Sequence, residues 1–385
     1  MDLTLENLLR FTVKQDASDL FLKAHCPPLL RRYGDMVPMK MDPLTPDQAR
    51  ALAYENLSDD DIHRFEEEWE LDYAHQVPDL ARFRCNVCRQ KGNVSSFYRV
   101  IPYSIKRMDD LGLPDIAQRA ADRPRGMVLV TGPTGCGKST SLAAMLRYIN
   151  ETRPEHIMTV EDPIEFIHDD VRCVVNQREV GSDTLSFQNA LKFVLRQDPD
   201  VILIGEMRDL ETIHLAITAA ETGHLVFATL HTTDAVQTVD RIIDVFPTHQ
   251  QQQVRMQLSV NLVAVLSQVL VKRADGRGRV PAFETMEAVP AIRNLIREAK
   301  THQIASIIQT GSKRGMWTLN QHLADLVIRG MADPEDARSK AGSPVEFDEF
   351  VAAGKPLIRD QASVRAGAKV HSHEDHSDTQ APLQR

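Results

Sequence analysis

The stretch GPTGCGKST, residues 132–140, is the feature that most restricts how this chain can fold. It matches the pattern G-x-x-x-x-G-K-[ST], and it stands between an apolar, β-rich run, MVLVT, and a stretch with helical periodicity, STSLAAMLRYIN. A loop in this setting holds phosphates with backbone N–H groups and the N-terminus of the helix. A glycine-rich turn that arises by chance would not explain the flanking strand and helix. The sequence therefore predicts an α/β unit that binds a nucleoside triphosphate.

The loop also predicts which residues hold the nucleotide. Lys138 is expected to meet the β- and γ-phosphates, and Ser139 to hold Mg²⁺, so the predicted cofactors are ATP and Mg²⁺. The predicted nucleotide-binding residues of the loop are Gly132, Pro133, Thr134, Gly135, Cys136, Gly137, Lys138, Ser139 and Thr140.

Two acidic segments supply the carboxylates that phosphoryl transfer needs. VILIGEMRD reads as a buried strand that ends at Gly205 and Glu206, and Glu206 is predicted to lie on the metal side of the site. TVEDPIEF follows another β-rich run, and Pro163 forces its chain out of regular structure where carboxylates cluster, among them Glu165. An acidic loop on a solvated face is the alternative for this second segment taken alone.

Strands and helices alternate from about residue 127 to 245, which implies a mainly parallel sheet covered on both faces. The helix after VILIGEMRD is expected to bury Leu210, Ile213 and Ile217. Parallel sheets bind ligands at the carboxyl ends of their strands, and four candidate residues fall there. They are Lys138, Glu165, Glu206 and His231.

Two histidines flank the strand HLVFATLH. His224 opens it and His231 closes it, so on a strand they would lie roughly 23 Å apart and could not share one metal. A lone histidine is more often a satisfied core or surface group than a catalytic one. His231 is nevertheless expected to sense the γ-phosphate, because it ends at the nucleotide edge of the sheet.

Composition excludes some classes of function. The formal charge of -9 and the lack of a basic, aromatic-rich run argue against a nucleic-acid-binding protein. No apolar run reaches the roughly 18–20 residues that span a bilayer, and the N-terminus does not look like a secretory signal. Five cysteines are too few for a disulfide framework, so a reducing, cytoplasmic setting is expected.

The chain resembles the PilT family of type IV pilus retraction ATPases, within the larger secretion ATPase superfamily. The shared segments run from ASDLFL near Ala17 to IQTGSKRGMWTLNQHL near Leu323. Besides GPTGCGKST they include TVEDPIEF, VNQREVG, VILIGEMRDLET, ETGHLVFATLH, TLHTTDA, DRIIDVFP and AIRNLIRE. Phe21 and Cys136 depart from the usual histidine and serine of the family.

The resemblance implies an α/β fold: an N-terminal PAS-like α+β domain, then a RecA-like P-loop ATPase domain with C-terminal helices. It also implies a ring of six subunits. By the same resemblance, Glu165 activates water, Glu206 supports Mg²⁺, and His224 and His231 couple the nucleotide to subunit motion. AIRNLIRE matches a segment needed for retraction. From the residues alone, Ile292, Leu295 and Ile296 form an apolar face, with Arg293, Arg297 and Glu298 displayed outside.

Arginines of the N-terminal domain reach the nucleotide at a subunit interface in that family, and the matching candidates are Arg82, Arg84 and Arg99. Arginine suits this role because its planar, fixed charge stabilises transferring phosphate oxygens. Solvated arginines on the face of a hairpin, with its turn at Lys91, Gly92 and Asn93, are the alternative.

The cysteines are expected to bind no zinc. Cys85 and Cys88 form a C-x-x-C, but residues three apart on a strand face opposite sides, and no second C-x-x-C completes a four-thiolate site. Cys136 is expected to leave phosphate binding unchanged because backbone amides do that work. The alternative is a thiol with a lowered pKa near the helix N-terminus, open to oxidation.

The expected organisation is a PAS-like domain at 1–105, a linker region at 106–125, an ATPase domain with C-terminal helices at 126–345, and a disordered tail at 346–385. The expected function is a hexameric ATPase motor of pilus retraction, cytoplasmic and peripheral to the inner membrane at the pilus base. Expected partners are its own copies, an inner-membrane platform protein and, as a further candidate, a paralogous retraction ATPase; nucleic acid is not expected. An accessory retraction ATPase, and less so an assembly or type II secretion ATPase, remain as alternatives.

Overall fold

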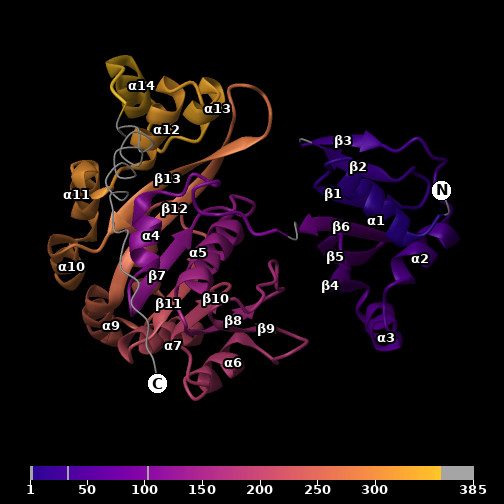
Figure 1. Cartoon of the computed structure of the whole chain (residues 1–385), viewed down its shortest axis with the longest axis horizontal. Helices are drawn as coiled ribbons and strands as arrows, with labels where there is room; N and C mark the ends of the chain where they lie inside the picture. The colour runs from indigo at the N-terminus through magenta and orange to yellow at the C-terminus, as the bar shows by residue number, and fades with distance from the viewer. Residues whose placement is uncertain (1–2, 33, 102–103, 357–385) are drawn as a thin grey trace, which may run out of the picture.

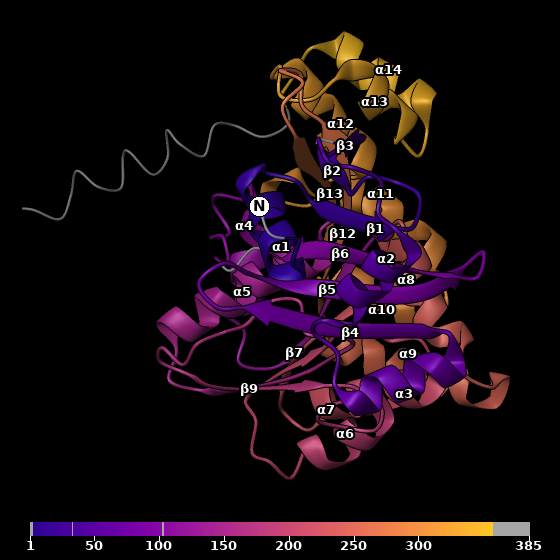
Figure 2. The same cartoon turned by 90° about the vertical axis from the view of Figure 1, so that its right-hand side faces the viewer.

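The chain forms two sheets that lie side by side (Figures 1 and 2). A computed structural model describes residues 3–32, 34–101 and 104–356. The first sheet belongs to the N-terminal unit, drawn in indigo and violet, and the second lies in the unit that carries the P-loop. Over these described ranges, no helix combines the length and the apolar character needed to cross a bilayer.

The N-terminal unit is an antiparallel sheet of six strands with helices packed on it. The strand order is β3-β2-β1-β6-β5-β4, and the apolar residues of α1 and α2 pack with alternate residues of β1 and β5. The elements are α1 (Leu5–Lys14), β1 (Asp19–Lys23), β2 (Leu29–Arg32), β3 (Asp35–Pro38), α2 (Pro46–Tyr54), α3 (Asp59–Glu68), β4 (Glu70–Val77), β5 (Ala81–Gln90) and β6 (Asn93–Ile101).

The predicted hairpin is confirmed, with β5 and β6 paired from Arg82↔Ile101 to Gln90↔Asn93. Its two turn residues, Lys91 and Gly92, have φ of 50° and 80°. Positive φ at both central positions is typical of a type I′ turn, whose backbone twist matches that of the two flanking strands.

The second sheet has seven strands in the order β13-β12-β7-β11-β10-β8-β9. All pairings are parallel except that of β12 with β13, which is antiparallel, so the predicted mainly parallel sheet is confirmed. The strands are β7 (Gly126–Thr131), β8 (His156–Glu161), β9 (Val174–Glu179), β10 (Val201–Ile204), β11 (Leu225–Leu230), β12 (Leu262–Lys272) and β13 (Arg279–Glu287).

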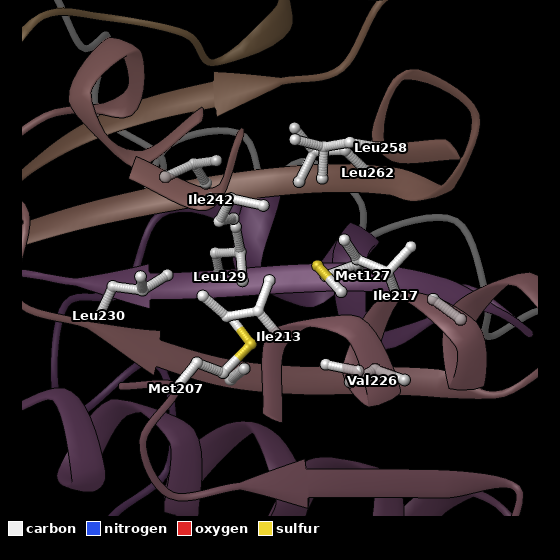
Figure 3. Packing of buried hydrophobic residues seen from close by; sticks show 14 of the residues in the cluster. Met127, Leu129, Met207, Ile213, Ile217, Val226, Leu230, Ile242, Leu258 and Leu262 are labelled. Atoms are coloured by element: carbon white, nitrogen blue, oxygen red, sulfur yellow. The ribbon is translucent and has the colours of Figure 1, made fainter. Parts of the chain in front are cut away.

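Helices cover both faces of this sheet. The buried strands are apolar at successive positions, so both of their faces must be shielded from water. On one face Met127 and Leu129 of β7 meet Ile213 and Ile217 of α7, as Figure 3 shows. Val128 and the other inward residues of the opposite face pack against α4 and α5. The helices are α4 (Asp115–Ala121), α5 (Lys138–Thr152), α6 (Phe187–Val194), α7 (Leu210–Glu221), α8 (Ala235–Asp244), α9 (Thr248–Asn261) and α10 (Pro290–Arg297).

Two expectations about these helices were wrong in detail. Leu210 begins α7 and is 37% exposed, so the buried side of that helix starts at Thr212 and Ile213 instead. The range expected to be a linker, 106–125, contains α4, whose residues Ile116 and Ala120 are buried against the sheet.

A helical group follows the long β12–β13 hairpin and α10, and it is drawn in orange and yellow in Figure 1. Its members are η1 (Thr301–Gln303), α11 (Ile304–Gln309), η2 (Ser312–Arg314), α12 (Leu319–Ile328), α13 (Pro334–Ser339) and α14 (Pro344–Ala353). Because α14 crosses residue 346 and buries Phe347 among the residues of α12, the tail was placed too early. The rest of the expected tail, from residue 357, lies outside the described residues.

Arg293 corrects the expectation for AIRNLIRE. The apolar residues of α10 are placed as expected, with Ile292 and Ile296 fully buried. Arg293 is not displayed outside: its guanidinium donates to the carbonyls of Ser259, Val260 and Leu262, where α9 ends, and to that of Ala288. A cation that satisfies the last carbonyls of a helix also complements the helix dipole. Arg293 therefore ties α10 to the end of α9.

Glu284 gives the fold a predicted pH dependence. Its carboxyl lies between the N-termini of α8 and α12, where Oε1 accepts from Ala235 N at 2.9 Å, and burial raises its pKa to about 7 from 4.5. The folded chain therefore retains this proton where the unfolded chain has lost it, so the contribution of Glu284 to stability is fully present below pH 4.5 and is lost as pH rises towards 7. The expected loss is about 3 kcal/mol. Urea unfolding at pH 5 and pH 8 measures this loss as a change in the free energy of unfolding. The change should be smaller in Glu284→Gln than in the wild-type protein. An equal change in the two proteins would contradict the prediction.

Candidate functional site

The P-loop joins the carboxyl end of β7 to the N-terminus of α5. Its three glycines, Gly132, Gly135 and Gly137, have φ of 138°, 77° and 92°. Such values suit glycine, and they let the backbone turn tightly beneath a phosphate. The loop lies at the carboxyl ends of the parallel strands, where sheets of this type bind ligands.

Gln268 of β12 holds this loop, a role that the sequence motifs gave no sign of. Its Nε2 donates to the carbonyl of Cys136 at 2.6 Å, and its Oε1 accepts from Ser141 Oγ of α5 at 2.7 Å. A Cβ at Gly132 would lie 2.2 Å from the Gln268 carbonyl, and one at Gly137 would lie 2.9 Å from its Nε2. The two glycines are thus needed for close packing against β12 as well as for backbone conformation.

Gln268→Leu is expected to raise the KM for ATP about tenfold, because it leaves buried polar groups of the loop unpaired. Steady-state hydrolysis over a range of ATP concentrations measures this. Ser267→Ala is the matched control, since it removes a buried bond of the same strand, to Thr131 Oγ1 at 2.8 Å, without freeing the carbonyl of Cys136. A KM that rises equally in both variants would contradict a specific role for Gln268.

Lys138 folds back over the loop. Its Nζ donates to the carbonyl of Gly132 at 2.8 Å and to that of Pro133 at 3.3 Å. The ammonium is thus held against the loop's backbone, while Ser139 and Thr140 lie in the first turn of α5. Its position suits contact with a phosphate that lies on the loop.

Cys136 lies in this loop and is buried, with 3% of its surface exposed. Burial raises the pKa of its thiol, although Lys138 acts in the opposite direction. The alternative of a lowered pKa is therefore wrong, because loss of hydration outweighs the nearby positive charge.

The loop after β8, residues 162–168, carries the acidic segment and is called the acidic loop below. Strand β9 holds it through alternate residues, which share one face of a strand. Gln177 Nε2 donates to the carbonyl of Phe166 at 2.8 Å, and its Oε1 accepts from His168 N at 2.8 Å. Glu179 Oε2 accepts from Ile164 N at 2.9 Å. The segment VNQREVG thus serves as the support of the acidic loop.

The two glutamates of the acidic segment differ in setting. Glu161 accepts from Thr159 Oγ1 at 2.7 Å and from Gln177 Nε2 at 3.2 Å, and burial raises its pKa to about 7. Glu165 is only partly buried and follows Ile164, whose N–H is fixed by Glu179. This contrast favours Glu165 over Glu161 as the carboxylate available to a reacting water.

Glu206 follows β10 and meets His231, which follows β11. His231 Nε2 lies 2.9 Å from Glu206 Oε1, and Arg208 Nη2 donates to Glu206 Oε2 at 2.7 Å. The hydrogen bond from Arg208 lowers the pKa of Glu206, against an opposing effect of burial. The structure therefore brings these two predicted site residues together at the carboxyl edge of the sheet, and Arg208 joins them.

His224 lies elsewhere, before β11 begins. Its Nδ1 is 2.9 Å from the carbonyl of Ala219 and 3.1 Å from Thr222 Oγ1, at the end of α7. The two histidines thus have separate surroundings at opposite ends of one strand, as the spacing predicted.

The three N-terminal arginines have different partners. Arg82 Nη2 donates to Glu179 Oε2 at 2.8 Å, across the two units, and Arg99 Nε donates to Asp19 Oδ1 at 2.8 Å. Arg84 is exposed and lies directly across from Arg99 in the β5–β6 register. Like charges opposite each other in a sheet repel, and Asp19, which pairs with Arg99, offsets part of that repulsion.

Cys85 and Cys88 lie on opposite faces of β5, as predicted. Phe83, Cys85 and Val87 are buried on one face of β5, whereas Cys88 lies on the other face and is partly exposed. Throughout the described ranges, no three or more His, Cys, Asp or Glu side chains gather as metal ligands would.

Mg²⁺ fits the residues at the nucleotide edge. Ser139 offers a hydroxyl in the first turn of α5, and Glu206, just after β10, offers a carboxylate whose two oxygens contact His231 and Arg208 in this structure. A hydroxyl, a carboxylate and phosphate oxygens form the hard-oxygen set that this ion prefers.

Comparisons with known proteins identify a family and several similar proteins. The family model described as type II/IV secretion system protein matches residues 104–333. The chain is 52% identical over 347 residues to the type IV pilus retraction ATPase PilT of Pseudomonas aeruginosa, covering 90% of this chain and 100% of that one. It is 49% identical over 335 residues to a twitching motility protein of Neisseria gonorrhoeae, covering 87% and 90%. A crystal structure of the pilus retraction motor PilT with bound ADP superposes with a TM-score of 0.83 and 44% identity, covering 90% of this chain and 99% of that chain.

Proposed function

The chain belongs to the type II/IV secretion system protein family, within it to the type IV pilus retraction ATPases, and we propose that its ATP hydrolysis drives pilus retraction. The observation that carries this is the joint placement of the P-loop, the acidic loop and the Glu206–His231 pair at one edge of a parallel sheet. Identity over nearly the whole chain to retraction ATPases supports the direction of the work.

In the proposed reaction, the P-loop amides, Lys138 and Ser139 bind the phosphates of ATP. Glu165 accepts a proton from the attacking water, whose oxygen bonds to the γ-phosphorus as the bond to the β–γ bridging oxygen breaks, releasing ADP and phosphate. Mg²⁺, held by Ser139 with support from Glu206, would neutralise charge on the phosphates. His231 joins Glu206 to the end of β11 and can transmit a change at the phosphates to that strand.

The finer architecture is also part of the proposal. The N-terminal unit is proposed to be PAS-like and the second unit RecA-like with C-terminal helices, six copies forming a ring. At its interfaces Arg84 and Arg99 are proposed to meet a neighbouring copy's nucleotide, because both side chains are exposed, Arg99 even though it pairs with Asp19, whereas Arg82 is largely buried against Glu179. We propose that the ring lies on the cytoplasmic side of the inner membrane, against a platform protein at the pilus base.

Glu165→Gln tests the function in cells. A retraction motor without turnover should leave pili extended, so surface pili should increase several-fold and twitching should stop; electron microscopy and a motility assay measure these. Loss of pili would instead indicate an assembly motor. Unchanged retraction would indicate an accessory ring.

A further inference from the structure

Glu179 connects three parts of the molecule with one carboxylate. It ends β9, its Oε2 accepts from Ile164 N at 2.9 Å in the acidic loop, and the same oxygen accepts from Arg82 Nη2 at 2.8 Å. The side chains of Arg82 and Glu179 are only 16% and 13% exposed. A charge-assisted pair that is this well shielded from water holds its geometry more firmly than a surface pair.

The contact of Arg82 with Glu179 depends on how the N-terminal unit is oriented, because the two residues lie in different units. It pairs with Ile101, the last residue of β6, after which the chain passes to the second unit. Its Nε is buried without a hydrogen-bond partner, so this arrangement leaves one donor that another orientation of the unit could satisfy.

We propose that Glu179 is a positioning residue through which the orientation of the N-terminal unit sets the acidic loop. With Arg82 in place, the carboxylate is held against Ile164 N and fixes the backbone next to Glu165. When the N-terminal unit turns and withdraws Arg82, the carboxylate loses its counter-charge, becomes better hydrated in another rotamer, and releases the loop. This inference rests on the proposed hydrolytic role of Glu165, and it adds a conformational control of that role from within the same chain.

Hydrogen–deuterium exchange of the full-length protein without nucleotide tests the connection directly. The peptide to follow covers residues 160–167. Glu179→Ala removes both contacts, whereas Glu179→Gln keeps an oxygen for Ile164 N and removes the ion pair. Amide exchange of this peptide should be about tenfold faster in Glu179→Ala than in the wild-type protein, and the increase should be smaller in Glu179→Gln.

A double-variant comparison separates the link between units from a local tether. Arg82→Gln should quicken exchange of the same peptide as much as Glu179→Gln, and the double variant should add nothing further. Glu66→Gln is the control, because it breaks ion pairs with Arg50 and Arg89 that lie within the N-terminal unit. If Arg82→Gln leaves the loop's exchange unchanged, or the double variant is additive, the proposal is wrong.

Steady-state kinetics tests the consequence for hydrolysis. Glu179→Ala should lower kcat about 10- to 100-fold with little change in the KM for ATP, since it displaces Glu165 and leaves the P-loop intact. Faster loop exchange with an unchanged kcat would overturn the positioning role. A wild-type chain without ATPase activity would overturn the proposed function instead, and the exchange result would still stand by itself.

Discussion

Replacing Glu165 with glutamine is expected to lower ATP turnover about 10²- to 10⁴-fold and to leave nucleotide affinity nearly unchanged. Glutamine has the same shape but cannot take a proton from the attacking water. Its neighbour Glu161 is not expected to replace it, because Oε1 of that carboxyl already accepts hydrogen bonds from Thr159 and Gln177. Phosphate release and binding of a fluorescent ATP analogue measure the two quantities.

Asp169→Asn is the matched control for this prediction. It makes the same change of charge close by, just after the acidic loop, at an exposed residue. Turnover should stay within about twofold of wild type, as expected of a surface position away from the reacting atoms. Equal losses in both variants would assign the effect to the charge of the segment, and full activity of Glu165→Gln would remove Glu165 from the reaction.

Lys138→Ala should weaken ATP binding about 10- to 100-fold and lower turnover at least as much. The ammonium already spans the loop by donating to the carbonyls of Gly132 and Pro133, so its removal takes away both a phosphate contact and a support of the loop. Titration with a fluorescent nucleotide and steady-state hydrolysis measure the loss.

Lys192→Ala provides the comparison for that variant. Lys192 forms an exposed ion pair with Glu211 on the surface between α6 and α7, where such pairs contribute little. The nucleotide affinity of Lys192→Ala should match that of the wild-type protein. If Lys138→Ala binds ATP as tightly as Lys192→Ala does, Lys138 does not contact the phosphates.

Local patterns predicted the core of the second unit well. The pattern around residues 132–140 specifies strand, loop and helix together, and β7 and α5 follow with Leu142, Met145 and Leu146 buried. Alternating strands and helices gave the mainly parallel sheet, since long crossovers are what parallel strands require. The Glu206–His231 pair follows from the same logic, because β10 and β11 are neighbours and both end there.

Predictions failed where a residue's partner is distant in the chain. Periodicity assigned Arg293 to the outward face of α10, yet three of the four carbonyls that hold it belong to α9 and to the start of β12. Likewise Phe347 lies in the stretch predicted to be a tail, yet it is buried in one cluster with residues of α12, β12 and β13. Periodicity describes one element at a time and carries no information on which other element lies against it.

The sequence by itself determined the nucleotide loop, the carboxylates and the sheet edge at which they gather, because each depends on spacing within a short segment. The tertiary structure decided how those parts are held. Gln268 reaches the P-loop from β12, and Glu179 reaches both the acidic loop and Arg82 from β9. The contacts to the P-loop and to the acidic loop form within the second unit, and the contact with Arg82 joins the two units. Each depends on the tertiary structure because its partners lie on different elements, which packing brings within about 3 Å.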